Sequence, residues 1–224
     1  QQAAQSALAA GLRNEELAAR TTAPSGKGDQ QPSGGLAPQG QAAKKPPVEG
    51  ALVALRPSDG AILALVGGRG FAFSNQLNRA TDITRPIGST VKPFIFAQAF
   101  EAGRASPDDV FDDKKLSFKL EGGRRWEPAN YGNKYFGKIT LREALAKSLN
   151  SVAIQLLQKA DIDGVIKLLS EATGQPAARF PRNLSLALGT GDLSPVAVAR
   201  AYAALANGGM TVEPYFVESI EDRN

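Results

Sequence analysis

A serine and a lysine three residues apart are the side chains in this sequence with the clearest capacity for covalent chemistry. Ser89 and Lys92 stand at the predicted start of a helix, because Pro93 follows and proline is favoured in a first helical turn. Residues three apart on a helix share one face, so the lysine amine can reach the serine hydroxyl. Serine becomes a strong nucleophile only when a neighbouring base takes its proton. The spacing therefore predicts acyl transfer to Ser89, with Lys92 as the base.

The composition narrows the choice of that base. The 224 residues include no histidine and no cysteine, which excludes a Ser-His-Asp triad, a thiol nucleophile and a zinc-thiolate site. A lysine base must be largely neutral, and lowering its pKa from about 10.4 to about 7.5 costs about 4 kcal/mol. Burial beside Val91, Phe94 and Ile95 would shift the pKa in this direction. The alternative is that Ser89 only caps the helix while Lys92 is exposed.

Three regions of different composition make up the chain. Residues 1–20 are rich in helix formers, and residues 21–49 hold five of the 14 prolines and five of the 23 glycines with few large aliphatic side chains. A segment of the second kind buries too little apolar surface to fold alone. We therefore predict a helix over 1–20, a flexible linker over 21–49 and a folded domain over 50–224.

The folded part is predicted to begin with a β-hairpin and to continue mainly as helices. Residues 51–56 and 61–66 are apolar runs, predicted to be covered on both faces, and a Pro-Ser-Asp-Gly turn sequence joins them. Four further helices are expected: one at 93–102, one after a capping box at Thr140, one at 164–173 with Asp163 as its cap, and one after Ser194. A last strand is expected at 215–220.

An ordered series of short motifs surrounds Ser89. These motifs are Val66-Gly67-Gly68, Asn78-Arg79-Ala80-Thr81, Arg85-Pro86-Ile87-Gly88-Ser89, Glu127-Pro128-Ala129-Asn130-Tyr131 and Leu141–Asn150. In this order, and over about residues 50–224, the sequence resembles the transpeptidase domain of class A penicillin-binding proteins, the bifunctional peptidoglycan synthases of bacteria. The wider superfamily, which includes the serine β-lactamases, shares S-x-x-K, a Ser/Asp/Asn motif and K-T-G.

The resemblance implies roles for the residues of two of these motifs. By it, Ser89 is the acylated nucleophile and Lys92 is the base. Ser148 would relay a proton towards the leaving amine, and Asn150 would hydrogen-bond the substrate backbone. Their residue types alone also fit a break between two helices, because short polar side chains compete for backbone hydrogen bonds.

The segment 104–138 carries six of the 15 aromatic residues. The resemblance makes it a wall of the substrate groove, with Trp126, Asn130 and Tyr131 expected to contact substrate. Packing of a long excursion explains each aromatic ring equally well. Aromatic and basic residues together also suit single-stranded nucleic acid, but aspartates at 108, 109, 112 and 113 argue against it.

The third motif of the family, K-T-G, has no counterpart in the sequence. Gly189-Thr190-Gly191 follows a leucine rather than a lysine, and we interpret it as a turn. By the resemblance, K-T-G and the last sheet strands would follow Asn224. The expected fold is therefore α+β, of the penicillin-binding protein and β-lactamase type: mostly its helical part with an N-terminal β-hairpin, and without the C-terminal sheet strands.

The function implied by the resemblance is that of a D,D-transpeptidase, which cross-links peptidoglycan stem peptides with release of D-alanine. β-Lactams would inhibit it by acylating the same serine, and neither a metal nor an organic cofactor is implied. Two alternatives stay open. A β-lactamase or D,D-carboxypeptidase would pass the acyl group to water, and a penicillin-binding-like scaffold or sensor module would not catalyse a reaction.

Partners and location are implied by the same resemblance. The expected partners are stem peptides, β-lactams and proteins of cell-wall synthesis, and no nucleic acid. The expected location is the bacterial cell envelope, on the periplasmic or extracytoplasmic face of the cytoplasmic membrane. A membrane anchor and a glycosyltransferase domain would precede this chain, with residues 1–20 as the helical start of the link between domains. The chain itself has no run of about 18 apolar residues, which a membrane-spanning helix needs.

Overall fold

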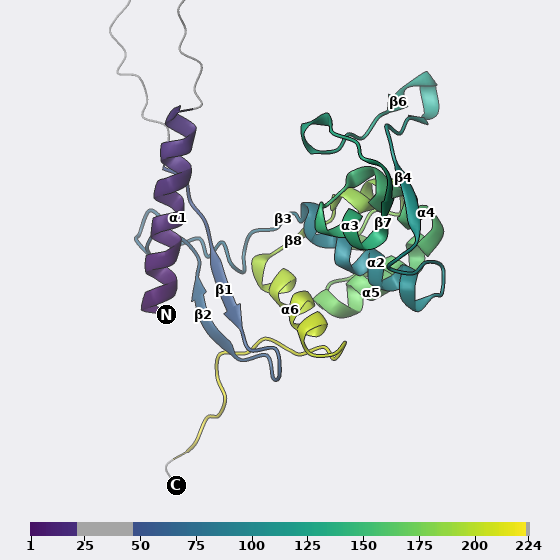
Figure 1. Ribbon diagram of the computed structural model, residues 1–224. Coiled ribbons are helices and arrows are strands. Elements are labelled where there is room, and N and C mark those ends of the chain that lie inside the picture. Colours follow the sequence, from purple (N-terminus) through teal and green to yellow (C-terminus); the bar gives the residue numbers. More distant parts are fainter. Residues whose placement is uncertain (22–46, 223–224) are drawn as a thin grey trace, which may run out of the picture.

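The computed structural model describes residues 1–21 and 47–222 (Figure 1). The linker predicted over 21–49 lies almost entirely outside these ranges. The helices are α1 (Gln2–Thr21), α2 (Lys92–Glu101), α3 (Leu141–Ala146), α4 (Asn150–Ala160), α5 (Ile162–Thr173) and α6 (Pro195–Ala206), with 3-10 turns that include η1 (Gly88–Val91), η3 (Tyr131–Asn133) and η5 (Leu184–Leu188). The strands are β1 (Leu52–Leu55), β2 (Ile62–Val66), β3 (Arg85–Pro86), β4 (Val110–Asp113), β5 (Phe118–Lys119), β6 (Arg125–Trp126), β7 (Gly137–Thr140) and β8 (Asp192–Leu193).

The body of the molecule is helical, and the strands accompany it as antiparallel pairs: β1 with β2, β3 with β8, β4 with β7 and β5 with β6. Helices α2 and α4 pack against each other in the core, and α5 and α6 complete the bundle. The predicted α+β fold with a mainly helical body is confirmed. Within the described ranges no helix is long and apolar enough to cross a membrane.

The predicted hairpin is formed by β1 and β2, with Leu52 opposite Val66. Its turn is fixed as the sequence suggests, because Oδ1 of Asp59 accepts a hydrogen bond of 3.0 Å from the backbone N–H of Ala61. Helix α1 packs against β2 and α6 packs against β1. The strands are nevertheless mostly half-buried and Leu63 is exposed, so the expectation that both faces are covered is wrong.

The strand predicted at 215–220 is not formed in the described chain. Tyr215 makes one parallel bridge to Ala61, with backbone hydrogen bonds of 2.9 Å from Ile62 and 3.1 Å to Gly60. The chain then leaves the hairpin (Figure 1). An apolar run becomes a strand only where a neighbouring strand accompanies it, and one bridge does not provide such a neighbour.

Most helix ends follow their capping signals. The Thr140 side chain accepts from the backbone N–H of Glu143 at 3.3 Å, and the Glu143 carboxylate accepts in return, which confirms the capping box of α3. Ser194 caps α6 as predicted. Helix α5 starts earlier than expected, because Asp161 and not Asp163 is its cap. Asp163 lies in the first turn, where a carboxylate suits the positive end of a helix.

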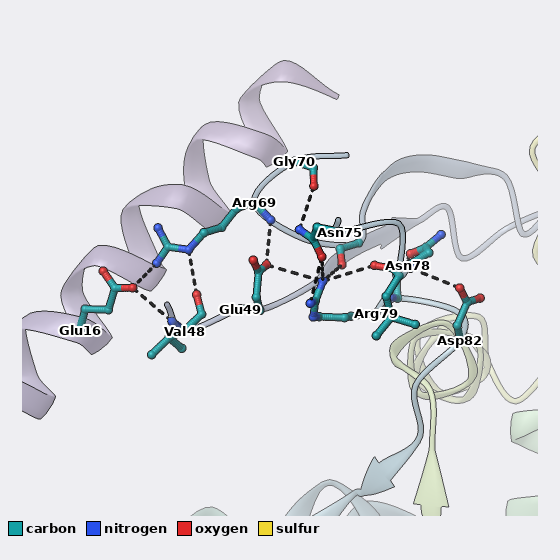
Figure 2. Close-up of polar contacts among 12 residues, drawn as sticks. Glu16, Val48, Glu49, Arg69, Gly70, Asn75, Asn78, Arg79 and Asp82 are labelled. Carbon is teal, nitrogen blue, oxygen red and sulfur yellow. Dashed lines mark hydrogen bonds and ion pairs between the residues drawn. The ribbon is translucent and has the colours of Figure 1, made fainter. Parts of the chain in front are cut away.

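Polar contacts tie α1 to the segment that follows β2 (Figure 2). Arg69 donates from Nη2 to Glu16 of α1 at 2.5 Å and from Nε to the carbonyl of Val48 at 2.8 Å. Glu49 accepts from the backbone N–H of Arg69 at 3.0 Å and forms an ion pair of 3.6 Å with Arg79. The described residues on both sides of the 22–46 segment therefore meet beside the V-G-G motif.

Two of the short motifs pack against each other. The backbone N–H of Arg79 donates to the carbonyl of Gly67 at 3.0 Å, and a Cβ on Gly67 would collide with Asn78. The carbonyl of Ala80 then accepts from Val196, near the start of α6, at 3.2 Å. V-G-G and N-R-A-T thus form one structural unit, which places the chain for β3 and the turn that carries Ser89.

Candidate active site

Ser89 lies on a turn that a distant segment holds in place. β3 leads into η1, and the backbone N–H groups of Ile87 and Gly88 donate to the carbonyls of Gly191 and Gly189 at 3.1 and 3.0 Å. Ser89 itself is exposed. Its hydroxyl makes no hydrogen bond within the described ranges, so it does not cap the helix and is free to meet a substrate. The G-T-G segment is a turn, as predicted, and it supports the turn of the proposed nucleophile.

Lys92, the first residue of α2, is buried in the helical core with only 1% of its surface exposed. Its ammonium group donates to the Ser148 carbonyl at 2.6 Å, to Asn150 Oδ1 at 2.7 Å and to Ser148 Oγ at 3.2 Å. Burial lowers the pKa of Lys92 from 10.5 to about 8. The interpretation of Lys92 as an exposed lysine beside a capping serine is therefore wrong.

The S-x-N motif is a helix break, and its geometry explains why Ser148 meets Lys92. Helix α3 ends in a Schellman motif, in which Leu149 N–H donates to the carbonyl of Ala144 at 3.0 Å and Ser148 N–H to that of Leu145 at 2.9 Å. This motif needs a left-handed residue, and Ser148 takes that conformation with a φ of 55°. The position usually belongs to glycine, so the serine is present at a cost in backbone strain.

We expect this strain to appear in a comparison of Ser148→Gly with Ser148→Ala. Both changes delete the hydroxyl, but only alanine keeps a Cβ at positive φ, so the glycine variant should be more stable by about 1 kcal/mol. Denaturant unfolding of the two variants measures the difference. Both should acylate more slowly than wild type and by similar factors. Equal stabilities would show that the turn carries no strain.

Asn150, the first residue of α4, is oriented from both ends of its amide. Its Oδ1 accepts from Lys92, and its Nδ2 donates to the carbonyl of Ala129 at 2.8 Å. One amide hydrogen and one lone pair are left over, and they suit the backbone of a bound peptide. The structure thus brings three sequence-predicted residues, Lys92, Ser148 and Asn150, into one hydrogen-bonded group.

Asn130 lies beneath this group and not at its surface, contrary to the expected substrate contact. The side chain is 5% exposed. Its Oδ1 accepts from the backbone N–H groups of Asn150 at 2.8 Å and Ser151 at 3.1 Å, and its Nδ2 donates to Asp113 at 2.7 Å and to the Lys134 carbonyl at 3.0 Å. All four hydrogen-bonding positions of the amide are occupied by protein groups, so none is available for a ligand.

Two residues of this network were not singled out from the sequence. Asp113 is 1% exposed, and Ser151 is fully buried and donates from Oγ to it. In the sequence, Asp113 is one of four nearby aspartates and Ser151 is one more serine on a helix. The alternation along β4 is the signal that was available, because it places residues 111 and 113 on the inward face.

The other two predicted groove residues have no polar contact with this cluster among the described residues. Trp126, on β6, is half-buried, and its ring packs against Phe118 with centroids 5.3 Å apart. Tyr131 directly follows Asn130 and is 100% exposed. The β5–β6 hairpin that carries Trp126 extends beyond the helices (Figure 1). A substrate contact of either ring stays a prediction.

The hydrogen bonds around Lys92 are suited to proton transfer. A neutral amine has two N–H donors and one lone pair. The Ser148 carbonyl and Asn150 Oδ1 can take the donors, so that the lone pair faces a hydroxyl group. Ser148 Oγ is one such hydroxyl, and Ser89 lies one turn earlier on the chain. Among the described residues, no three acidic side chains cluster in a way that would hold a metal ion.

This arrangement is chemically suited to acyl transfer to a serine, with a buried lysine in the place of a histidine base. The family described as "Penicillin binding protein transpeptidase domain" matches residues 50–224. The chain belongs to this family, and the resemblance noted in the sequence is confirmed.

The relatives agree with this assignment. The chain is 41% identical over 179 residues to penicillin-binding protein 1A of Pseudomonas aeruginosa, covering 80% of this chain and 22% of the relative. Penicillin-binding protein 1A of Escherichia coli is 37% identical over 180 residues, which cover 80% of this chain and 21% of the relative. The chain therefore spans about a fifth of the length of these relatives.

Solved structures give the same answer for the fold. The crystal structure of penicillin-binding protein 1A from Haemophilus influenzae matches 78% of this chain and 26% of its own, with a TM-score of 0.73 and 38% identity. Penicillin-binding protein A from M. tuberculosis, as an imipenem acyl-enzyme complex, matches 75% of this chain and 48% of its own, with a TM-score of 0.59 and 28% identity. The predicted type of fold is thereby confirmed.

Proposed function

We propose that this chain is part of a D,D-transpeptidase that cross-links the stem peptides of peptidoglycan through an acyl-serine intermediate. The observation that carries the proposal is the Lys92 amine: it is buried, has a pKa of about 8, and bonds to both polar residues of the S-x-N motif. An amine of this kind can accept a proton near neutral pH, which an ordinary lysine cannot. Membership of the transpeptidase family supports the same reaction.

In the proposed first half-reaction, Ser89 Oγ forms a bond to the carbonyl carbon that precedes the terminal D-alanine. The hydroxyl proton passes to the Lys92 amine. The bond from that carbon to the D-alanine nitrogen then breaks, and the proton reaches the leaving nitrogen through Ser148. Asn150 holds the substrate backbone with the free positions of its amide. Trp126 and Tyr131 are proposed to line the groove.

In the second half-reaction, the amine of a neighbouring stem peptide attacks the ester carbon. A new peptide bond replaces the ester, and the proton of the attacking amine returns to Ser89 Oγ through Lys92. The enzyme is thereby restored without a cofactor. A β-lactam is proposed to react at the same serine but to leave an ester that no amine removes. The imipenem acyl-enzyme of the M. tuberculosis relative supports this part of the proposal.

The wider setting is also a proposal. The relatives named penicillin-binding protein 1A support a place for this chain in the cell envelope, in a protein that also carries a glycosyltransferase activity and acts at the outer face of the cytoplasmic membrane. In that setting α1, which is tied to the domain through Glu16 and Arg69, is proposed to be a helical part of the link between domains.

Intact-mass measurement tests the chemistry directly. The complete polypeptide that contains this chain is incubated with benzylpenicillin, and its mass is expected to rise by the whole mass of the drug, since ring opening expels no group. Peptide mapping should place the adduct on the peptide with Ser89, and Ser89→Ala should take up none. Thr90→Ala, at the neighbouring exposed position, serves as the matched control and should still be labelled.

The outcomes separate acyl-serine chemistry of the transpeptidase type from a β-lactamase and from a module that does not catalyse. An adduct that persists for many minutes supports the acyl-serine chemistry that a transpeptidase and a D,D-carboxypeptidase share. An adduct that forms and is lost within seconds, with drug turnover, would assign the chain to a β-lactamase. A complete lack of adduct in folded protein would leave the scaffold or sensor module and would overturn the proposed function.

A further inference from the structure

A buried polar cluster lies under the S-x-N motif and is not used by the mechanism described above. Its members are Asp113 at the end of β4, Asn130 after β6 and Ser151 in the first turn of α4. They come from three segments that are well separated along the chain. Their common neighbour is the start of α4, where Asn150 contacts Lys92.

The carboxylate of Asp113 is held by neutral hydrogen-bond donors only, among the residues that the structure describes. Oδ1 accepts from Asn130 Nδ2 at 2.7 Å and from Ser151 Oγ, and Oδ2 accepts from the backbone N–H of Phe136 at 2.9 Å. A buried carboxylate is expensive unless it is fully hydrogen-bonded. Replacing it with an apolar residue would be the simpler solution for stability alone, so its presence suggests a positional role.

The chemistry of Asp113 determines which way the amide of Asn130 points. An ionised carboxylate can only accept hydrogen bonds, so the NH₂ end of Asn130 must face Asp113. The oxygen end then faces α4 and accepts from the first two N–H groups of that helix, those of Asn150 and Ser151. These N–H groups have no partner inside the helix, and Asn130 caps them from another segment.

The same short segment also fixes the side chain of Asn150. The carbonyl of Ala129, the residue before Asn130, accepts from Asn150 Nδ2, so the oxygen of that amide faces the Lys92 amine. A segment in which Asn130 is clamped by Asp113 therefore orients both the backbone and the side chain of Asn150. This arrangement of donors and acceptors satisfies all of these groups at once.

We propose that Asp113 is a positioning residue for acylation, which acts through Asn130 and the start of α4 to hold Asn150 and the Lys92 amine in their productive places. The proposal rests on the proposed function, because it presumes that Lys92 activates Ser89. The proposal gives the segment from β4 to β7 a mechanistic role, since this segment supplies the carboxylate that sets the direction of the hydrogen bonds in the cluster.

Asp113→Asn tests this role with almost no change in shape. The new NH₂ group must face either Asn130 Nδ2 or the Phe136 N–H, and both are donors, so one hydrogen bond is lost in either orientation. In the first orientation the Asn130 amide loses its acceptor, and in the second the side chain at position 113 loses its backbone anchor at Phe136. Misplacement of catalytic groups by fractions of an ångström lowers rates steeply. We expect the maximal rate of benzylpenicillin acylation to fall by about 10- to 100-fold per folded molecule, with little change in the drug's initial dissociation constant.

Two control variants distinguish positioning from general destabilisation. Asp112→Asn makes the same chemical change at the adjacent, exposed position of β4 and should leave the acylation rate unaltered. Ile166→Val removes one methyl group from the buried face of α5 and should lower the melting temperature without changing the rate per active site. Rates are taken from stopped-flow acylation and normalised to sites titrated with labelled drug.

A double-mutant cycle tests the route through Asn150. If Asp113 acts by placing Asn150, then Asp113→Asn should lower the acylation rate much less in an Asn150→Ala background than in wild type. The effects of the two substitutions on the logarithm of the rate should then not add. If Asp113→Asn fails to fold, Ser151→Ala is used in its place, because it removes one of the three hydrogen bonds to Asp113. The acylation rate of this variant should fall by about threefold to tenfold.

An unchanged maximal rate in folded Asp113→Asn, or full additivity in the cycle, would overturn the inference while the proposed function stands. Failure of wild type to form an adduct at Ser89 would instead remove the proposed function itself. The two failures are distinct, because the first is read only in a protein whose wild-type form acylates.

Discussion

Replacing Lys92 with methionine or arginine is expected to lower the rate of acylation by about 10²- to 10⁴-fold. Methionine fills the same buried space but cannot accept a proton. Arginine keeps the positive charge and the hydrogen-bond donors, but it stays protonated in proteins and so cannot serve as a base. If the two variants lose activity alike, the proton-accepting function of Lys92 is its essential contribution. Stopped-flow acylation with benzylpenicillin measures all three proteins.

The pH profile provides the second half of this prediction. Burial places the pKa of Lys92 at about 8, so the neutral, competent amine accumulates as the pH rises through that value. The second-order acylation constant, which reports on the free enzyme, should therefore increase about tenfold per pH unit below pH 8 and level off above it. The lysine variants should lack this rise. Lys147→Met, at the exposed lysine directly before Ser148, is the matched control. This variant should keep the rise of the acylation constant with pH.

The unfolding free energy should also depend on pH through the lowered pKa of Lys92. The pKa of Lys92 is lower in the folded protein than its ordinary value of 10.5, so between about pH 8 and that value the unfolded chain binds the extra proton. Unfolding free energy should thus rise with pH across this window in wild type relative to Lys92→Met. Below pH 8 the lysine is protonated in both the folded and the unfolded chain, and the difference should be constant. A flat difference throughout, together with a flat acylation profile, would show that Lys92 titrates as an ordinary lysine and is not the base.

The sequence was informative where the signal is local. The capping box at Thr140 and the cap at Ser194 correctly mark helix starts, because a cap is a contact between residues three positions apart. Burial of Lys92 could also be anticipated, since its neighbours Val91, Phe94 and Ile95 are apolar on several sides of a helix. Local chemistry of this kind is visible in a single chain without any knowledge of its fold.

The sequence was less informative where the contact joins distant segments. Asn130 was expected to face substrate, but the groups that occupy its amide belong to β4 and α4. Asp113 looked like any other aspartate until β4 turned it inward against Ser151. The alternation along β4 can indicate that residue 113 points inward, but no periodicity specifies which residues of other segments it will meet. For the same reason the apolar run at 215–220 predicts a strand that the structure does not form beyond the bridge of Tyr215 to Ala61.

The turn at 189–191 has a local sequence signal and also makes a contact with a distant segment. This contact is the basis of the second prediction with a large effect on acylation. Its glycines suggested a turn, correctly, but the sequence does not reveal that this turn touches the segment of the proposed nucleophile. Gly189 has a φ of 70°, and its backbone carbonyl accepts from the Gly88 N–H at 3.0 Å. A Cβ at Gly189 would lie well inside van der Waals distance of the Gly88 backbone. Neither partner is a flexible side chain, so the two backbones must separate to admit a methyl group.

Gly189→Ala is therefore expected to displace the turn that carries Ser89 and to lower acylation by about 100-fold or more per folded molecule. It should also destabilise the protein by about 1–3 kcal/mol beyond the strain of positive φ, because the methyl group overpacks a closed contact. Circular dichroism melts and stopped-flow acylation measure the two effects.

Gly208→Ala isolates the part of this effect that is due to backbone strain alone. Gly208 has nearly the same φ, 66°, but nothing lies within 4 Å of the position that a Cβ would occupy. This variant should lose about 1 kcal/mol of stability and acylate at the wild-type rate. If Gly189→Ala also kept the wild-type rate, the contact between Gly88 and Gly189 would not position Ser89. A selective loss of acylation in Gly189→Ala instead identifies the G-T-G turn as the support that keeps the serine in place while the lysine removes its proton.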